Sequence, residues 1–231
     1  DAERLVAGGV DGLLIENYGD APFYPESVSK HTVAAMTRVA AAVDRVVDCP
    51  LGINVLRNDA AAAVSIAAAV GADFVRINVH TGAAVTDQGV IDGRAHKTIR
   101  LREHLGVNTE ILADVDVKRA TPLATGRSVG GRVADLVERG LADGMVVSGS
   151  GTGETVETDT LEQAVAARSD HGLSTPILVG SGVTPDSVEE LLSVADGAIV
   201  GTALKAGGQT TNPVDVSRVE KLMHAVVELR T

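Results

Sequence analysis

Pro176-Ile-Leu-Val-Gly-Ser-Gly-Val-Thr-Pro-Asp-Ser187 is the stretch of this chain that decides its fold. Its apolar start predicts a strand over Ile177–Val179, and the turn Gly180-Ser181-Gly182 ends that strand. Thr184-Pro185-Asp186 then predicts the beginning of a helix, because these residue types favour the first helical positions. A strand, a glycine turn and a helix in direct succession are typical of a β-α unit in a parallel sheet.

The same arrangement returns shortly afterwards in Asp196-Gly-Ala-Ile-Val-Gly-Thr-Ala-Leu-Lys205, where the strand ends at Gly201 and Thr202. Glycine turns let bare backbone N–H groups approach a ligand, and a helical N-terminus favours an anion. Two such turns on adjacent strands are typical of the phosphate-binding loops that close many (β/α)8 barrels. We therefore predict a phosphate site at Ser181, Gly182, Gly201 and Thr202.

Apolar runs of strand length alternate with helical patterns along the whole chain, which predicts an α/β fold with a parallel sheet. A Gly-Ala-Asp or Leu-Ala-Asp-Gly phrase precedes several runs, as expected of equivalent units in a barrel. We expect residues 1–231 to form one (β/α)8 barrel of the TIM type that lacks its first β-strand through N-terminal truncation. A seven-stranded or open variant is the alternative. The predicted strands are Gly12–Glu16, Leu51–Leu56, Phe74–Val79, Glu110–Val115, Gly144–Ser148, Ile177–Val179 and Ala198–Val200.

Polar side chains interrupt these strands near their carboxyl ends, although helix-covered parallel strands are usually apolar throughout. Some of them alternate, and residues two apart share one strand face, so each alternating series is expected to line one side of the barrel mouth. The charges can balance one another, which leaves two interpretations, an active-site floor and a structural ion-pair layer. The set comprises Glu16, Asn54, the pair Arg76 and Asn78, and the series Asp114, Asp116 and Lys118.

The chemistry of these side chains suggests their roles. The three acids are candidate catalytic groups that move a proton, and the two asparagines and Arg76 are candidates for binding and orienting a substrate. Lys118 is the fourth catalytic candidate. Its acidic neighbours are expected to raise its pKa, which favours an orienting or electrophilic role over a Schiff base.

Two further loops carry glycines beside polar residues. His80-Thr81-Gly82, followed by Thr86-Asp87-Gln88-Gly89, is either a lid or binding loop or a solvated turn. Ser148-Gly149-Ser150-Gly151-Thr152-Gly153 has the composition of a flexible linker, but its place after a strand favours phosphate contact at Gly149. No GxGxxG fingerprint occupies a first βαβ unit, so dinucleotide binding is not expected.

The sequence predicts no cofactor and no metal. The six histidines form no HxH or HExxH pair, and the single Cys49 excludes both a CxxC site and an internal disulfide. Asp114 and Asp116 are the residues that would hold Mg²⁺, which is the less favoured interpretation.

Composition narrows the class of protein further. The apolar fraction of 45% with only 2% aromatic residues predicts an aliphatic core, and no apolar run is long enough to be a transmembrane segment. A net charge of −11 argues against nucleic acid as a partner, and it fits either a halophile-like composition or a GC-rich genome with an acidic surface. The lone cysteine fits a cytoplasmic location. Such barrels often form homo-oligomers, but the sequence does not fix that state.

The chain resembles the BtpA/SgcQ family in phrases that run through nearly its whole length in order. Its His80 departs from the family pattern, in which a more neutral residue is expected. The matching phrases are Gly12-Leu-Leu-Ile-Glu-Asn-Tyr-Gly-Asp-Ala-Pro-Phe23, Gly52-Ile-Asn-Val-Leu-Arg-Asn-Asp59, Arg76-Ile-Asn-Val-His-Thr-Gly82, Thr86-Asp-Gln-Gly89, Ala113-Asp-Val-Asp-Val-Lys118, Gly180-Ser-Gly-Val-Thr184 and Asp196-Gly-Ala-Ile-Val-Gly-Thr-Ala-Leu-Lys205.

The resemblance implies a TIM-barrel-like, phosphate-binding fold. It also implies one more strand ahead of the first match, in keeping with the expected truncation. The founding cyanobacterial member is associated with photosystem I biogenesis, and the SgcQ branch accompanies sugar metabolism. Two functions are therefore expected. One is binding of a small phosphosugar or nucleotide-derived compound, with an aldolase-, lyase- or isomerase-type step without a redox cofactor. The other is a non-catalytic biogenesis or stability factor for a membrane complex.

Overall fold

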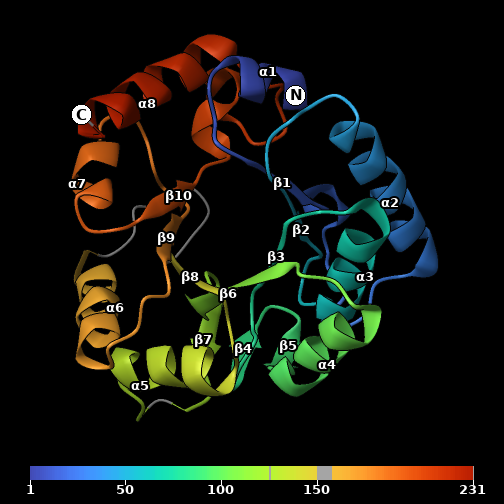
Figure 1. Cartoon of the computed structure of the whole chain (residues 1–231), viewed down its shortest axis with the longest axis vertical. Helices are drawn as coiled ribbons and strands as arrows, with labels where there is room; N and C mark the ends of the chain where they lie inside the picture. Colours follow the sequence, from blue (N-terminus) through green and yellow to red (C-terminus); the bar gives the residue numbers. More distant parts are fainter. Residues whose placement is uncertain (125, 150–157, 231) are drawn as a thin grey trace.

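Seven parallel strands form one curled sheet with helices around its outer side (Figure 1). The computed structural model describes residues 1–124, 126–149 and 158–230. The order of the strands in the sheet follows the order in the chain, as in a (β/α) barrel, and the predicted fold class is confirmed. Each predicted strand is present to within two residues at either end. The strands are β1 (Leu13–Glu16), β2 (Leu51–Asn54), β3 (Phe74–Ile77), β6 (Glu110–Asp116), β8 (Gly144–Ser148), β9 (Ile177–Gly180) and β10 (Gly197–Ile199).

The helices begin and end where local chemistry favours it. Asp59 accepts a hydrogen bond from the Ala62 N–H at the start of α3, and Gly71, with φ of 75°, ends that helix in the left-handed region. No helix of the described residues is long and apolar enough to cross a membrane. The helices are α1 (Ala2–Ala7), α2 (Lys30–Asp44), α3 (Ala60–Val70), α4 (Ala95–Leu105), α5 (Val129–Ala134) with a following π-helical turn (Asp135–Arg139), α6 (Thr158–Asp170), α7 (Val188–Leu192) and α8 (Val216–Leu229).

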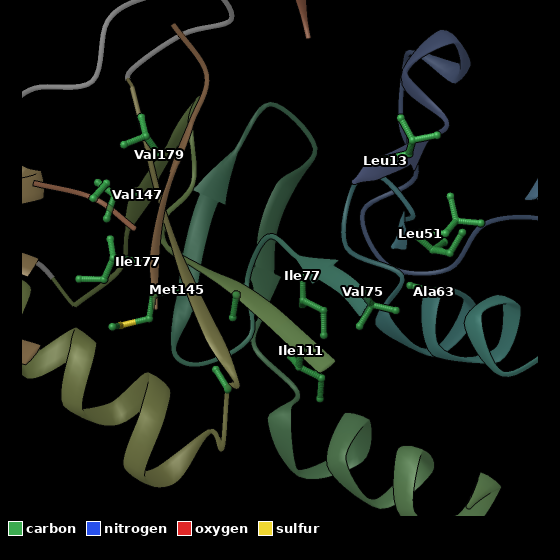
Figure 2. Packing of buried hydrophobic residues seen from close by; sticks show 14 of the residues in the cluster. Leu13, Leu51, Ala63, Val75, Ile77, Ile111, Met145, Val147, Ile177 and Val179 are labelled. Carbon is green, nitrogen blue, oxygen red and sulfur yellow. The ribbon is translucent and has the colours of Figure 1, made fainter. Parts of the chain in front are cut away.

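The main core lies between the sheet and the helices, and Figure 2 shows alternate strand residues on that side. Val75 and Ile77 of β3 and Met145 and Val147 of β8 are among them, each at most 3% exposed. The intervening residues face the inside of the barrel, where large side chains lie over glycines. A Cβ atom at Gly52 would lie 2.1 Å from the Phe74 ring. This pairing of large and small residues fills the interior with few aromatic side chains.

Three aspartates of the repeated Ala-Asp phrase fix the amino-terminal end of the sheet. Asp73 donates its N–H to the Leu51 carbonyl at 2.8 Å, and its Oδ2 accepts from the Leu51 N–H at 2.8 Å. Asp143 makes the same two bonds to Ile111, and Asp196 makes them to Ile177. Each aspartate thus joins the start of its own strand to the start of the preceding strand. We call these three residues the aspartate locks.

A small antiparallel sheet covers part of the carboxyl-terminal end. It contains β4 (Ala83–Thr86), β5 (Gly89–Asp92) and β7 (Ala120–Pro122), in the order β5-β4-β7. Val79, Ala84, Ile91 and Val117 form its own buried cluster. The loop after the predicted strand Phe74–Val79 is therefore a β-hairpin with one packed face, and not the simple solvated turn that was one of its two interpretations. Gly89, with φ of 97°, supplies the left-handed conformation that this hairpin needs.

Candidate functional site

A buried ion pair lies at the carboxyl-terminal end of the large sheet. Arg76 of β3 donates from Nε to Asp114 Oδ1 at 2.8 Å and from Nη2 to Asp114 Oδ2 at 2.9 Å. The Arg76 side chain is 4% exposed and that of Asp114 is fully buried. Burial alone would lower the pKa of Arg76, but the charge and hydrogen bonds of Asp114 outweigh burial and raise it. Arg76 is therefore a permanent cation, held against Asp114 inside the barrel by two hydrogen bonds.

Three more polar residues join this pair inside the barrel. Asn54 donates from Nδ2 to Glu16 Oε1 at 2.8 Å, and that oxygen lies 3.7 Å from Arg76 Nη1. Arg76 Nη2 also donates to the Ser148 hydroxyl at 3.2 Å. We call Glu16, Asn54, Arg76, Asp114 and Ser148 the floor cluster. The Glu16 side chain remains 28% exposed, so it is the acid of this cluster that a solute can reach.

The turn after β9 lies directly against the floor cluster. A Cβ atom at Gly180 would lie 2.9 Å from Ser148 Oγ and 3.2 Å from Arg76 Nη2. Only glycine leaves room there for the guanidinium group. Ser148 was not predicted as a site residue. Its position two residues after Val146 indicates that it shares the inward face of β8.

Lys118 connects the floor cluster to that turn. It follows β6, and its Nζ donates to Ser181 Oγ at 3.2 Å. The buried Arg57 donates from Nη2 to the Lys118 carbonyl at 2.7 Å and so holds the backbone in place. Burial lowers the pKa of Lys118, and the charge of Arg76 lowers it further, against the opposing charges of Glu16 and Asp114. Acidic neighbours do raise this pKa, as expected, but burial and Arg76 outweigh them, so the net shift is downward.

Asp116 lies apart from the floor cluster. The register between β6 and β8 shifts between Asp114 and Asp116, and this irregularity interrupts the alternation of faces. Asp116 Oδ2 instead accepts from Arg132 Nη2 of α5 at 2.6 Å. Burial raises the pKa of Asp116, although its bond to Arg132 opposes that shift. The expectation that Asp114, Asp116 and Lys118 line one side of the mouth is thus wrong for Asp116.

A cavity of about 100 Å³ lies between the ends of β3 and β6, the small sheet and α5. Asn78, Asp114, Asp116 and Arg132 are among the residues that line it. Asn78 is 4% exposed, and its Oδ1 has no hydrogen-bond partner in the described part of the chain. A buried amide without a partner beside a cavity is a group that a ligand or an ordered water would satisfy.

The two glycine turns lie side by side, because β9 and β10 pair in parallel with Ile199 opposite Gly180. Ser181 and Gly182 have φ values of 93° and 74°. Within residues 1–124, 126–149 and 158–230, the N–H groups of Gly182, Gly201 and Thr202 donate to no protein acceptor. Gly149 is buried just beyond β8, and the rest of its predicted loop, residues 150–153, lies outside the described residues.

The structure gives other polar strand ends a structural role. Asn17 accepts from the Leu56 N–H at 2.7 Å and donates to the Leu56 carbonyl at 3.3 Å, and Asn58 makes the same two kinds of bond to Val79. Arg57 also follows a strand end, but it was not predicted as a site residue. It contacts the site through its hydrogen bond to the Lys118 carbonyl. No group of three or more His, Cys, Asp or Glu residues suited to a metal ion occurs among the described residues.

Comparison with known proteins shows where this chain belongs. It is 44% identical to the photosystem I biogenesis protein BtpA of Synechocystis sp. over 99% of this chain and 78% of that protein. It is 45% identical to the uncharacterized protein TK2179 of Thermococcus kodakarensis over 100% of this chain and 85% of that protein.

Solved structures share the fold at low identity. Phosphoribosyl anthranilate isomerase from Thermus thermophilus superimposes with a TM-score of 0.63 at 12% identity, covering 100% of this chain and 94% of that one. Such a likeness supports the barrel fold and says nothing of activity. Residues 1–228 match the BtpA family, and the chain therefore belongs to the BtpA family.

Proposed function

We propose that this protein binds a small phosphorylated compound at the carboxyl-terminal end of its sheet. The phosphate would accept hydrogen bonds from the turns at Ser181-Gly182 and Gly201-Thr202, with Gly149 on a third side. The observation that carries the proposal is the bond from Lys118 to Ser181, because it places an amine on the predicted phosphate turn, next to Gly180, whose backbone lies against the floor cluster. A ligand on the turn would reach the floor cluster with its other end.

The floor offers groups for a proton-transfer reaction without a redox cofactor. Glu16 is the accessible carboxyl group, and Arg76 and Lys118 would stabilise negative charge that develops on a carbonyl or enediolate oxygen. Asn78, whose Oδ1 has no partner among the described residues, would accept a hydrogen bond from the ligand beside the cavity. An aldolase-, lyase- or isomerase-type step on a phosphosugar or nucleotide-derived compound uses this set of groups.

Isothermal titration with ribose 5-phosphate, ribose and inorganic phosphate tests the proposal. The Ser181→Asp variant places a negative charge on the turn, and Ser181→Asn is its matched neutral control. Both side chains tolerate the positive φ of this position. We expect the two phosphorylated probes to bind the wild type and Ser181→Asn, and to lose binding in Ser181→Asp. Equal binding to both variants, or no binding of any phosphate probe to the wild type, would contradict the proposal.

A second candidate function comes from the cyanobacterial relative, which is named for photosystem I biogenesis. Under that function the chain would act as a non-catalytic assembly factor for a membrane complex. A Glu16→Gln variant separates the two ideas, because it keeps the hydrogen bond from Asn54 but removes the acid. Full biological activity of this variant in the source organism would favour the assembly factor, and its loss with an unchanged melting temperature would favour the enzyme.

A further inference from the structure

We propose that Lys118 is a nucleophile that forms an imine with an aldehyde or ketone carbonyl of the bound phosphorylated compound. This inference rests on the proposed function, since it places the ligand's phosphate on the turn that Lys118 contacts. It narrows the substrate class to short phosphorylated aldoses and ketoses. It also assigns Lys118 a covalent role, in place of the orienting role expected from the sequence.

The first argument is that the two aspartates nearest to Lys118 in the sequence form hydrogen bonds with arginines and not with Lys118. Both carboxylate oxygens of Asp114 accept from Arg76, and Asp116 is paired with Arg132. No carboxylate of the described residues lies within ion-pair distance of Lys118 Nζ. The only hydrogen bond of Nζ in that part of the chain goes to the neutral hydroxyl of Ser181. The amine is therefore available to a ligand.

The second argument is the position of the amine. Lys118 is half-buried, its carbonyl accepts from Arg57, and the next residue, Arg119, has a φ of 57° that fixes the direction of the chain. Nζ is thereby held beside the hydroxyl of the phosphate turn. A ligand whose phosphate rests on that turn brings a carbonyl only a few bonds away within reach of Nζ.

The surroundings also favour the reactive form of the amine. Burial and the charge of Arg76 lower the pKa of Lys118, which increases the fraction of neutral amine near neutral pH. A desolvated lysine next to another cation is a known way to prepare such a nucleophile. Lys205 is a useful contrast, because burial lowers its pKa as well, yet its Nζ is paired with Asp1 at 2.7 Å.

The proposed step balances without an oxidant or a reductant. The neutral amine attacks the carbonyl carbon, a C–N bond forms, and the carbonyl π electrons move to oxygen. A proton passes from nitrogen to that oxygen, and Glu16 or water supplies the second proton that lets it leave as water. The product is a protonated imine, which accepts the electron pair when an adjacent C–H or C–C bond breaks.

Reductive trapping with pyridoxal 5′-phosphate tests the inference, because this probe carries both a phosphate and an aldehyde. The full chain is incubated with the probe, reduced with borohydride and mapped by peptide mass spectrometry. Its five lysines, Lys30, Lys97, Lys118, Lys205 and Lys221, serve as internal controls. We expect Lys118 to be labelled about tenfold faster than the other four at neutral pH, because its neutral form is more populated. Inorganic phosphate should slow the labelling of Lys118 alone.

Three further measurements make the result decisive. Pyridoxal without phosphate should label Lys118 more slowly than pyridoxal 5′-phosphate does, because it lacks the group that the turn would hold. Dihydroxyacetone phosphate followed by borohydride should leave a covalent adduct on Lys118. A Lys118→Arg variant that melts at the wild-type temperature should carry no adduct. The rate of labelling at Lys118 should reach its half-maximum at a lower pH than the rate at Lys205.

The outcomes separate this inference from the proposed function. If the phosphate probes bind but Lys118 labels no faster than the other lysines, the inference is overturned and the proposed function stands. Equal labelling of Lys118 by pyridoxal with and without phosphate also overturns the inference. If no phosphorylated probe binds at all, the proposed function fails first and the inference fails with it.

Discussion

Polar side chains have opposite roles at the two ends of the sheet. At the amino-terminal end, the carboxylates of Asp143 and Asp196 each accept both a strand N–H and an arginine, at 2.5 to 2.9 Å. At the carboxyl-terminal end, and among the residues that the structure describes, Asn78 has no partner for its buried Oδ1, and the Nζ of Lys118 bonds only to a hydroxyl. The difference separates groups that hold the barrel together from groups left free for a ligand.

The floor cluster lies between these extremes. Its central pair, Arg76 and Asp114, is hydrogen-bonded on both sides, as the exposed aspartate locks are, but it is buried and lies at the end that carries the candidate site. Glu16 is held by Asn54 on one oxygen and stays partly exposed. A rigid, hydrogen-bonded centre with an accessible acid at its edge is how a barrel presents reactive groups without losing stability.

Breaking the central pair should cost the most. Arg76→Met leaves the carboxyl group of Asp114 buried without its partner, so the free energy of unfolding should fall by about 3–5 kcal/mol. Guanidinium denaturation followed by circular dichroism measures this loss. The double variant Arg76→Met/Asp114→Leu should recover most of it, because no buried charge then remains. A single variant that loses less than about 1 kcal/mol would show that the pair does not hold the floor together.

Crowding the floor should have the next largest effect. A Cβ atom at Gly180 would lie 2.6 Å from Val146 Cγ1, so Gly180→Ala should lose about 1–3 kcal/mol of stability through overpacking. Gly201→Ala is the matched control in the neighbouring turn, because its Cβ would meet nothing within 4 Å and its φ is negative. Thermal unfolding of both variants measures the difference. Equal melting temperatures would contradict the close approach of the turn to Arg76.

Opening an aspartate lock should reduce stability and leave the site intact. Asp73→Ala removes the acceptor of the buried Leu51 N–H, which should cost about 1–3 kcal/mol. Asp73→Asn keeps an acceptor oxygen and should lose much less. Ribose 5-phosphate should bind both folded variants as it binds the wild type. Weaker binding to Asp73→Ala at a temperature where it is folded would mean that the two ends are coupled.

At Asn78 we expect a substitution to weaken ligand binding without lowering stability. Because its Oδ1 has no partner, Asn78→Leu should leave the free energy of unfolding unchanged or raise it by up to about 1 kcal/mol. Asn54→Leu is the control, since Asn54 donates to Glu16 at 2.8 Å and its loss should be destabilising. Binding of ribose 5-phosphate should weaken in Asn78→Leu. A clear destabilisation by Asn78→Leu would place this residue among the structural groups.

The sequence was informative wherever apolar residues form a continuous run. The apolar runs predicted all seven strands of the large sheet, and the alternation at Arg76 and Asn78 placed both at the carboxyl-terminal end of β3. Asp116 could not be placed, because the β6–β8 irregularity that moves it to Arg132 depends on pairing between distant segments. The small sheet was missed because β4 and β5 are short and expose residues such as Val85 and Val90. The lowered pKa of Lys118 depends on burial and on Arg76, which spacing along the chain does not reveal.

His80 gives the smallest effect and belongs to the structural side of the comparison. It is 1% exposed, and its Nε2 lies 2.8 Å from the Gly140 carbonyl, so the ring donates there. Burial lowers the pKa of His80 below the ordinary 6.5 of the unfolded chain, against the bond to Gly140. The unfolded state therefore binds the proton more readily, and stability should fall as the pH drops below about 6.5. Above that pH the ring is neutral in both states and contributes no pH dependence.

A His80→Gln variant tests this assignment, because glutamine can donate to the same carbonyl but does not titrate. Urea denaturation between pH 5 and pH 7.5 should show a shallower fall in stability for the variant than for the wild type. Ribose 5-phosphate should bind both proteins alike at pH 7.5. Identical pH profiles would mean that the protonation of His80 does not change the free energy of unfolding. Weaker binding at pH 7.5 would move His80 to the ligand side, through its Nδ1, which has no partner among the described residues.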